Sequence, residues 1–125
     1  MNLLDDMFLH KGTESEGDAF VVVLQHQPQH PIYKVHFHGQ PITPGACLIQ
    51  LAGELLEKQL QKKIALQTIK NVKFLSMLVP QEDGIVKFVF SGIEEDEVRC
   101  SAKVEVRDEE NVYAKMSLVY NISER

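Results

Sequence analysis

The residues best suited to chemistry stand around one predicted helix start. His36 ends a segment that we expect to be extended, and glycine and proline residues then lead to the helix. Thr43 is a good N-cap, and Pro44 suits the first helical position because its missing N–H would have no partner there. The N–H groups of Gly45 and Ala46 are then left to bind an anion or an oxyanion.

Two polar side chains, Gln50 and Glu54, follow on one face of the predicted helix, a turn of about 5.4 Å apart. Gln50 interrupts an apolar stretch, so it requires a hydrogen-bond partner, either in the protein or in a substrate. Glu54 fits a functional role and the solvated stripe of the helix equally well. An imidazole titrates at about pH 6.5, so His36 beside these groups is suited to acid–base chemistry.

Length and composition indicate one globular domain, 1–125, with 44% hydrophobic and 25% charged residues. The net charge of −5 argues against binding to nucleic acid or to an anionic membrane. The first residues are acidic where a signal peptide needs positive charge, and no apolar run reaches membrane-spanning length. We therefore expect a cytoplasmic protein, with Cys47 and Cys100 as reduced core thiols.

The histidines before the helix do not form a convincing metal site. They stand on both sides of a proline-containing loop, and no cysteine or acidic ligand accompanies them at a spacing typical of zinc. The residues concerned are His26, His30, His36 and His38. We expect no metal and no other cofactor.

Apolar periodicity predicts an α+β fold. A helix is expected over 44–63, apolar nearly all round in its first half and amphipathic in its second. Residues 98–107 and 112–122 alternate cleanly, as strands do when an antiparallel sheet covers a core on one side. Less regular patterns predict a helical turn over 2–10, a polar turn over 12–18, an extended segment over 32–37, and strands over 19–26, 69–78 and 84–90. The result is one buried helix followed by a four-stranded antiparallel meander, to which the strand 19–26 is added.

The pattern His36-Phe37-x-Gly39-x-Pro41-x-x-Pro44-Gly45 at this helix start resembles the β-hydroxyacyl-(acyl carrier protein) dehydratases of fatty-acid synthesis. The segment 72–80 is similar to the strand that follows the helix in that family. The resemblance implies the hotdog fold, an antiparallel sheet wrapped around one long central helix. It also implies that His36 is the catalytic base or acid and that the Gly45 N–H holds the thioester carbonyl. Further substrate contacts are then expected at Phe37, Pro44 and Ala46.

The chain departs from the family at the acid. The family has a carboxylate at the position of Gln50 and a glutamine at that of Glu54, so the two are exchanged here. A glutamine can orient water or a hydroxyl, but it cannot donate a proton as a general acid at neutral pH. The main hypothesis is dehydration of a 3-hydroxyacyl thioester by His36, with Glu54 and Gln50 handling the leaving hydroxyl.

Two alternatives belong to other functional classes. The first is a catalytically weak or silent hotdog subunit, which binds an acyl thioester or completes a heterodimer with an active dehydratase. The second is an acyl thioesterase in which Glu54 is the base for water.

Partners follow from the same resemblance. The substrate thioester is carried by an acyl carrier protein or by CoA, and an acidic carrier would dock on Lys58, Lys62 and Lys63. The resemblance implies a dimer, or a multiple of dimers, in which the sheets join edge to edge. Each site then lies between subunits, with His36 from one and the central helix from the other.

Overall fold

The computed structural model describes residues 7–27 and 42–123. The described residues form one helix and six strands. Their order along the chain is β1 (Phe8–Glu16), β2 (Ala19–His26), α3 (Gly45–Leu60), β3 (Ile64–Phe74), β4 (Ile85–Glu95), β5 (Arg99–Arg107) and β6 (Val112–Ile122).

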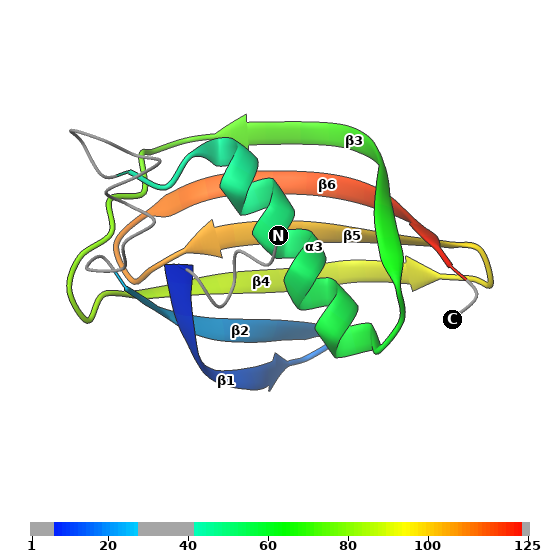
Figure 1. The fold of residues 1–125 in the computed structure, drawn as a ribbon, viewed down its shortest axis with the longest axis horizontal. Coiled ribbons are helices and arrows are strands. Elements are labelled where there is room, and N and C mark those ends of the chain that lie inside the picture. Colours follow the sequence, from blue (N-terminus) through cyan, green and yellow to red (C-terminus); the bar gives the residue numbers. More distant parts are fainter. Residues whose placement is uncertain (1–6, 28–41, 124–125) are drawn as a thin grey trace.

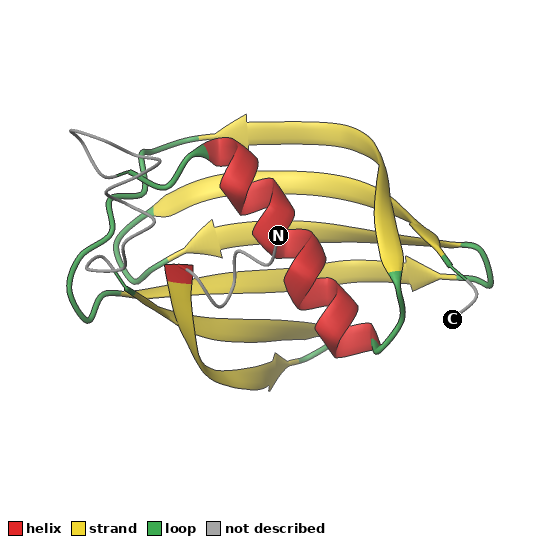
Figure 2. Cartoon of the chain, in the orientation of Figure 1, coloured by secondary structure: helices red, strands yellow, loops and turns green. Residues whose placement is uncertain are grey.

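The strands form a single antiparallel sheet in the order β1-β2-β4-β5-β6-β3, and α3 lies across one of its faces (Figures 1 and 2). The prediction of a sheet around one central helix is confirmed. The prediction of a four-stranded meander after the helix is wrong in one respect, because β3 pairs with β6 and not with β4. After α3 the chain goes to the far edge of the sheet, and only β4, β5 and β6 follow one another as neighbours.

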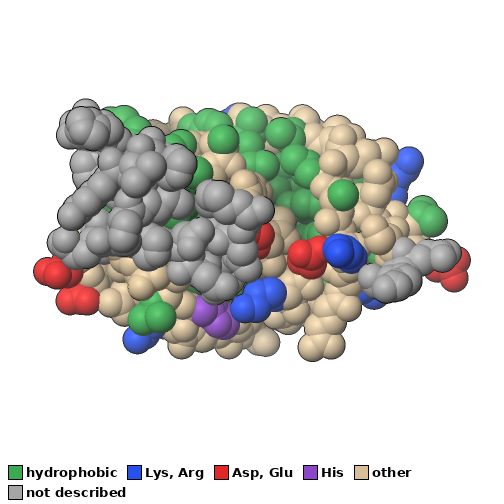
Figure 3. All heavy atoms as spheres, in the orientation of Figure 1, with side chains coloured by type: hydrophobic (Ala, Val, Ile, Leu, Met, Phe, Trp, Pro, Cys, Tyr) green, Lys and Arg blue, Asp and Glu red, His purple; other side chains and the backbone are tan. Residues whose placement is uncertain are grey.

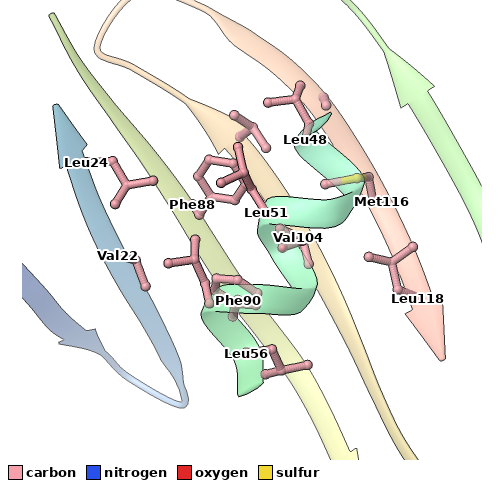
Figure 4. Close-up of a cluster of buried hydrophobic side chains, with 14 of the residues drawn as sticks. Val22, Leu24, Leu48, Leu51, Leu56, Phe88, Phe90, Val104, Met116 and Leu118 are labelled. Carbon is pink, nitrogen blue, oxygen red and sulfur yellow. The ribbon is translucent and has the colours of Figure 1, made fainter. Parts of the chain in front are cut away.

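The core lies between α3 and the sheet. Leu51 and Leu56 of the helix lie near Phe88 and Phe90 on β4, and Leu48 lies nearer to Met116 on β6 (Figure 4). All of these side chains are at most 4% exposed. Strands β5 and β6 confirm the predicted alternation, because their inward-facing residues from Cys100 to Val106 and from Ala114 to Tyr120 are buried. This row of apolar contacts fixes the face of α3 that turns inward.

The sequence predicted a first half of the helix that is buried on every side, and this prediction is wrong. Ala46 and Gln50 are exposed and Ile49 is half-buried. The reason is that β3, at the sheet edge, has no strand beyond it within 7–27 or 42–123. One side of α3 therefore stays open, and its apolar residues there need another cover.

Several predicted boundaries change. Residues 8–16 form the edge strand β1, where a helical turn over 2–10 and a polar turn over 12–18 were expected, and the turn is confined to Gly17 and Asp18. β3 begins at Ile64 and ends at Phe74, earlier at both ends than the predicted 69–78. β4 continues to Glu95. The expected extended segment 32–37 and the first six residues lie outside the described parts.

The end of the helix is fixed by local hydrogen bonds. Gln61 adopts the left-handed conformation (φ 55°) and its N–H donates to the carbonyl of Glu57 at 2.9 Å. The carboxylate of Glu57 accepts the N–H of Ile64 at 2.9 Å, which ties the start of β3 to α3. Within the described ranges, no helix combines the length and apolar character needed to cross a bilayer.

Candidate active site

The helix start lies where the sequence predicts it, but its cap is one residue later. α3 begins at Gly45, and Pro44 is its N-cap, in an extended conformation (φ −64°, ψ 151°). Thr43 was the predicted cap; its hydroxyl is instead buried and has no hydrogen-bond partner in the structure described. The carbonyl of Pro44 accepts the N–H groups of Cys47 (3.0 Å) and Leu48 (3.2 Å), which makes it the first acceptor of the helix.

Gly45 and Ala46 therefore carry the first amides of α3, which no carbonyl of the helix can accept. Neither N–H has a hydrogen-bond partner among residues 7–27 and 42–123. The positive end of the helix dipole lies at the same point. A negatively charged oxygen placed there would be stabilised by both effects, as oxyanion binding requires.

Gln50 and Glu54 form a hydrogen-bonded pair on the open side of α3. Nε2 of Gln50 donates to Oε2 of Glu54 at 2.9 Å. Gln50 thus has one partner within its own helix, and because it is exposed the expected apolar surroundings do not enclose it. The charge of Glu54 also acts on Cys47, about two turns earlier, where it adds to the larger effect of burial in raising the pKa of the thiol. The acid and the amide are therefore hydrogen-bonded neighbours on this face of the helix.

A pocket of about 390 Å³ lies beside this pair, between α3, β3 and β6. Its walls include Ala46, Ile49, Gln50, Glu54, Leu66 and Tyr120. In Figure 3, hydrophobic side chains gather over the part of the surface where Figure 1 places α3 and β3. One pocket therefore joins Ala46 in the first turn of the helix, a carboxylate and an apolar wall.

Tyr120 is a residue of this pocket that the sequence analysis did not identify. Its hydroxyl is buried without a hydrogen-bond partner in the described structure, and burial strongly raises the pKa of the phenol. Gly53 leaves room for the ring: a Cβ at this glycine would lie 3.5 Å from Cε2 of Tyr120. The available signal was a tyrosine in the otherwise apolar inward-facing row of β6.

A second hollow, of about 340 Å³, lies on the outer face of the sheet around Lys103, Glu105 and Lys115. Glu105 is bound there by Arg107 at 3.6 Å and by Lys115 at 4.0 Å. The carboxylate of Glu105 is thus paired with two cations, and the hollow lies on the face of the sheet away from α3. The hollow beside the Gln50–Glu54 pair is the better candidate for catalysis.

His36 and Phe37 lie outside the described residues, so their predicted roles stay predictions. The structure brings together Pro44, Gly45, Ala46, Gln50 and Glu54 along the first turns of α3. It does not test the approach of His36 to them.

His26, one of the histidines weighed for metal binding, is a core residue at the end of β2. Its ring packs against Phe8 with 5.1 Å between ring centroids, and its Nδ1 has no hydrogen-bond partner in the described regions. Burial lowers the pKa of His26 to about 4, against a smaller opposing effect of Asp108. The side chain is therefore neutral at pH 7, and its role is structural.

The lysines proposed for carrier docking are only partly available. Lys62 forms an ion pair with Glu95 from the end of β4, whereas Lys58 and Lys63 are exposed. Because Glu95 cancels the charge of Lys62, the net positive charge of this group is smaller than the sequence indicated.

The sheet around one central helix defines a hotdog-fold protein of the type shared by dehydratases and thioesterases. A similar solved structure is the dehydratase heterocomplex ApeI:P from Xenorhabdus doucetiae, with 16% identity over 91% of this chain and 97% of that one and a TM-score of 0.69. A putative thioesterase from Lactococcus lactis matches over 100% of both chains with 16% identity and a TM-score of 0.67. A hypothetical thioesterase with coenzyme A from Streptococcus pneumoniae TIGR4 matches at 13% identity over 90% and 84%, with a TM-score of 0.62.

The chain belongs to the ApeI-like dehydratase family, because the model of that family, described as ApeI dehydratase, matches residues 12–116. The predicted relationship to hotdog dehydratases is thus confirmed, and the family is the ApeI-like one. The narrower resemblance to the enzymes of fatty-acid synthesis stays a prediction. The comparison with curated proteins finds no match.

Proposed function

We propose that this protein is a dehydratase that removes water from a 3-hydroxyacyl thioester. The observation that carries the proposal is that one pocket is bordered both by the start of α3 and by the Gln50–Glu54 pair. A thioester oxygen at the amide of Gly45 or Ala46 would place its acyl chain along the apolar wall. Membership of the ApeI-like dehydratase family supports the same reaction.

In this mechanism His36 takes a proton from the carbon next to the thioester carbonyl. The N–H of Gly45 stabilises the charge that grows on the carbonyl oxygen, a contribution of about 3 kcal/mol for one such donor. The bond from carbon 3 to its hydroxyl then breaks, and the proton that His36 took reaches the leaving hydroxyl through the Glu54 carboxyl group, so that it departs as water. His36 and Glu54 are then back in their starting states, which completes the cycle.

The exchange of acid and amide gives each member of the pair a definite role. Gln50 has no proton to give at neutral pH, so the acid must be Glu54. The hydrogen bond from Gln50 Nε2 restricts the orientation of the Glu54 carboxyl group. The carbonyl oxygen of Gln50 can accept a hydrogen bond from the substrate hydroxyl and so align it for departure.

The open edge of the sheet supports a dimer. Leu66 and Ile69 on β3 are 43% and 42% exposed, and the segment that follows exposes Leu75, Met77 and Val79. An unpaired strand edge with apolar side chains is a ready surface for pairing with another chain. A second copy would cover it edge to edge, and a related hotdog subunit could cover it in the same way in a heterodimer.

Hydrolysis of the thioester is the second candidate. It is favoured by the similarity of the fold to structures described as thioesterases. In that reaction Glu54 would take a proton from water, and the water oxygen would attack the thioester carbonyl held by Gly45. Free acid and free thiol would be the products.

A product analysis distinguishes these functions. The purified protein is incubated with 3-hydroxybutyryl thioesters of CoA and of an acyl carrier protein, and the products are separated by mass. An enoyl thioester supports the dehydratase, and the faster of the two substrates identifies the carrier. Free acid without enoyl thioester supports hydrolysis, and recovery of unchanged substrate supports the silent subunit.

A further inference from the structure

We propose that Phe74 is a positioning residue of this site: its ring holds the start of α3, and glycine is required at position 45 because the ring fills the place of a side chain. The inference rests on the proposed function for its catalytic part, since Gly45 is there the oxyanion donor. The contact itself is independent of the reaction.

The contact is close and direct. A Cβ built on Gly45 would lie 2.5 Å from Cζ of Phe74 and 2.8 Å from both Cε atoms. All three atoms belong to the outer end of the ring, so the ring points at the helix start. Phe74 is nevertheless 51% exposed. Filling of the core therefore does not explain a phenylalanine at this position.

The backbone gives no separate reason for glycine. Gly45 is the first residue of α3, and the glycines with positive φ in the described parts of the chain are Gly17 and Gly92. Alanine adopts a right-handed helical conformation more readily than glycine does. The three atoms nearest to a side chain at this point all belong to the ring of Phe74.

The backbone on both sides of the contact is anchored. The N–H of Thr43 donates to the carbonyl of Leu78 at 2.7 Å, which ties the entrance of the helix to the segment after β3. Phe74 is paired with Ala114 on β6, and the N–H of Leu75 donates to Tyr113 at 2.8 Å. These bonds hold the backbone at the helix start and at the base of the ring, so a side chain at position 45 could be accommodated only if the Phe74 ring rotated away.

The position of the Gly45 amide is then set by β3 and β6 through one aromatic ring. A small displacement of an oxyanion donor weakens its bond to the transition state more than its bond to the ground state. Loss of the contact should therefore lower kcat more than it changes KM.

The test is a double-mutant cycle of Gly45→Ala and Phe74→Ala, measured first by the chemical-denaturation midpoint of the full chain. Gly45→Ala should lower the midpoint in the presence of Phe74 and should leave it unchanged or raise it in the Phe74→Ala background. Gly53→Ala is the matched control on the same helix, because its Cβ would meet Tyr120 at 3.5 Å, an ordinary contact. Equal effects of Gly45→Ala in both backgrounds would overturn the proposal.

The same four proteins are then compared in the dehydration assay. Gly45→Ala should reduce kcat by about 100-fold, the loss expected for one oxyanion donor, with a smaller change in KM. The double variant should have a kcat about tenfold or more above that of Gly45→Ala alone, because the helix start can then relax. If the two losses multiply, Phe74 does not position the site. If the wild-type protein forms no enoyl thioester, the proposed function fails, while the denaturation cycle still decides whether the contact exists.

Discussion

At the scale of single residues, the Gln50–Glu54 pair is the feature that most defines this chain. The resemblance to the dehydratases of fatty-acid synthesis alone would leave the acid missing, because it implies a carboxylate at the position of Gln50. The 2.9 Å hydrogen bond shows that the two side chains share one place on the helix face. The carboxyl group of this chain thus lies one turn after Gln50, beside the same pocket as Gln50.

Tyr120→Phe should leave the protein equally stable or more stable, by up to about 1 kcal/mol in the free energy of unfolding. The buried hydroxyl has no hydrogen-bond partner in the described structure, so the folded protein bears the cost of removing it from water. A phenylalanine would not bear this cost. The measurement is urea denaturation of the two proteins. A loss of more than about 1 kcal/mol would show that the hydroxyl has a hydrogen-bond partner in solution.

His26 should make stability depend on pH in weakly acidic solution. Burial lowers its pKa from 6.5 to about 4 in the folded chain, so between these values the unfolded state binds more protons. Stability should therefore fall as the pH is lowered from 6.5 to 4, by at most about 3 kcal/mol from this group.

The check is a series of denaturation midpoints from pH 4 to pH 7 for the wild type and for His26→Leu. The difference between the two curves isolates His26 from the other titrating groups. The wild type should lose stability more steeply below pH 6.5, and parallel curves would contradict the assigned burial effect.

The outcome for individual residues shows where sequence reasoning works. The start of the helix was predicted to within one residue, because a proline followed by small residues marks a helix start with few alternatives. Thr43 was wrongly taken as the cap, since its preference for that position is outweighed by the extended conformation of Pro44. The contact between Phe74 and Gly45 joins two distant parts of the chain, so local spacing could not predict it.

At the scale of elements, the strands with one buried face were the ones that the sequence predicted. β5 and β6 each bury alternate residues, and their apolar pattern therefore repeats every second position. β1 and β3 are the two edge strands, and most of their side chains are exposed on both faces. Without an alternating pattern, β1 was mistaken for a turn and β3 was given the wrong bounds.

The edge strand β3 carries a prediction about assembly. Ile69→Lys should weaken self-association by about tenfold or more, because it places a charge on the apolar edge proposed for the dimer. The measurement is the molar mass in sedimentation equilibrium over a range of concentrations. Val98→Lys is the control, since Val98 is 62% exposed between β4 and β5, away from this edge.

An unchanged dissociation constant for the Ile69→Lys protein would contradict a dimer built on β3. If the wild-type chain is monomeric alone and associates only with a related hotdog subunit, the assembly is a heterodimer and not a homodimer.

At the scale of the whole molecule, the site and the open edge lie on the same side. The sheet covers the inward face of α3, while the start of the helix, the Gln50–Glu54 pair and the pocket face the side bounded by β3. This arrangement agrees with the expectation that each site is completed by a neighbouring subunit. The sequence could predict the sheet and the helix, but not that the helix would be left open on one side.

The central claim is that the helix start and His36 form one dehydratase site. It is tested most directly by the rate at which 3-hydroxybutyryl thioester becomes enoyl thioester, measured for the wild type, His36→Ala, Glu54→Gln and the exposed control Glu97→Gln. We predict a loss of about 100-fold or more in kcat/KM for the first two variants and none for the control. Full activity in the His36→Ala protein would contradict the account.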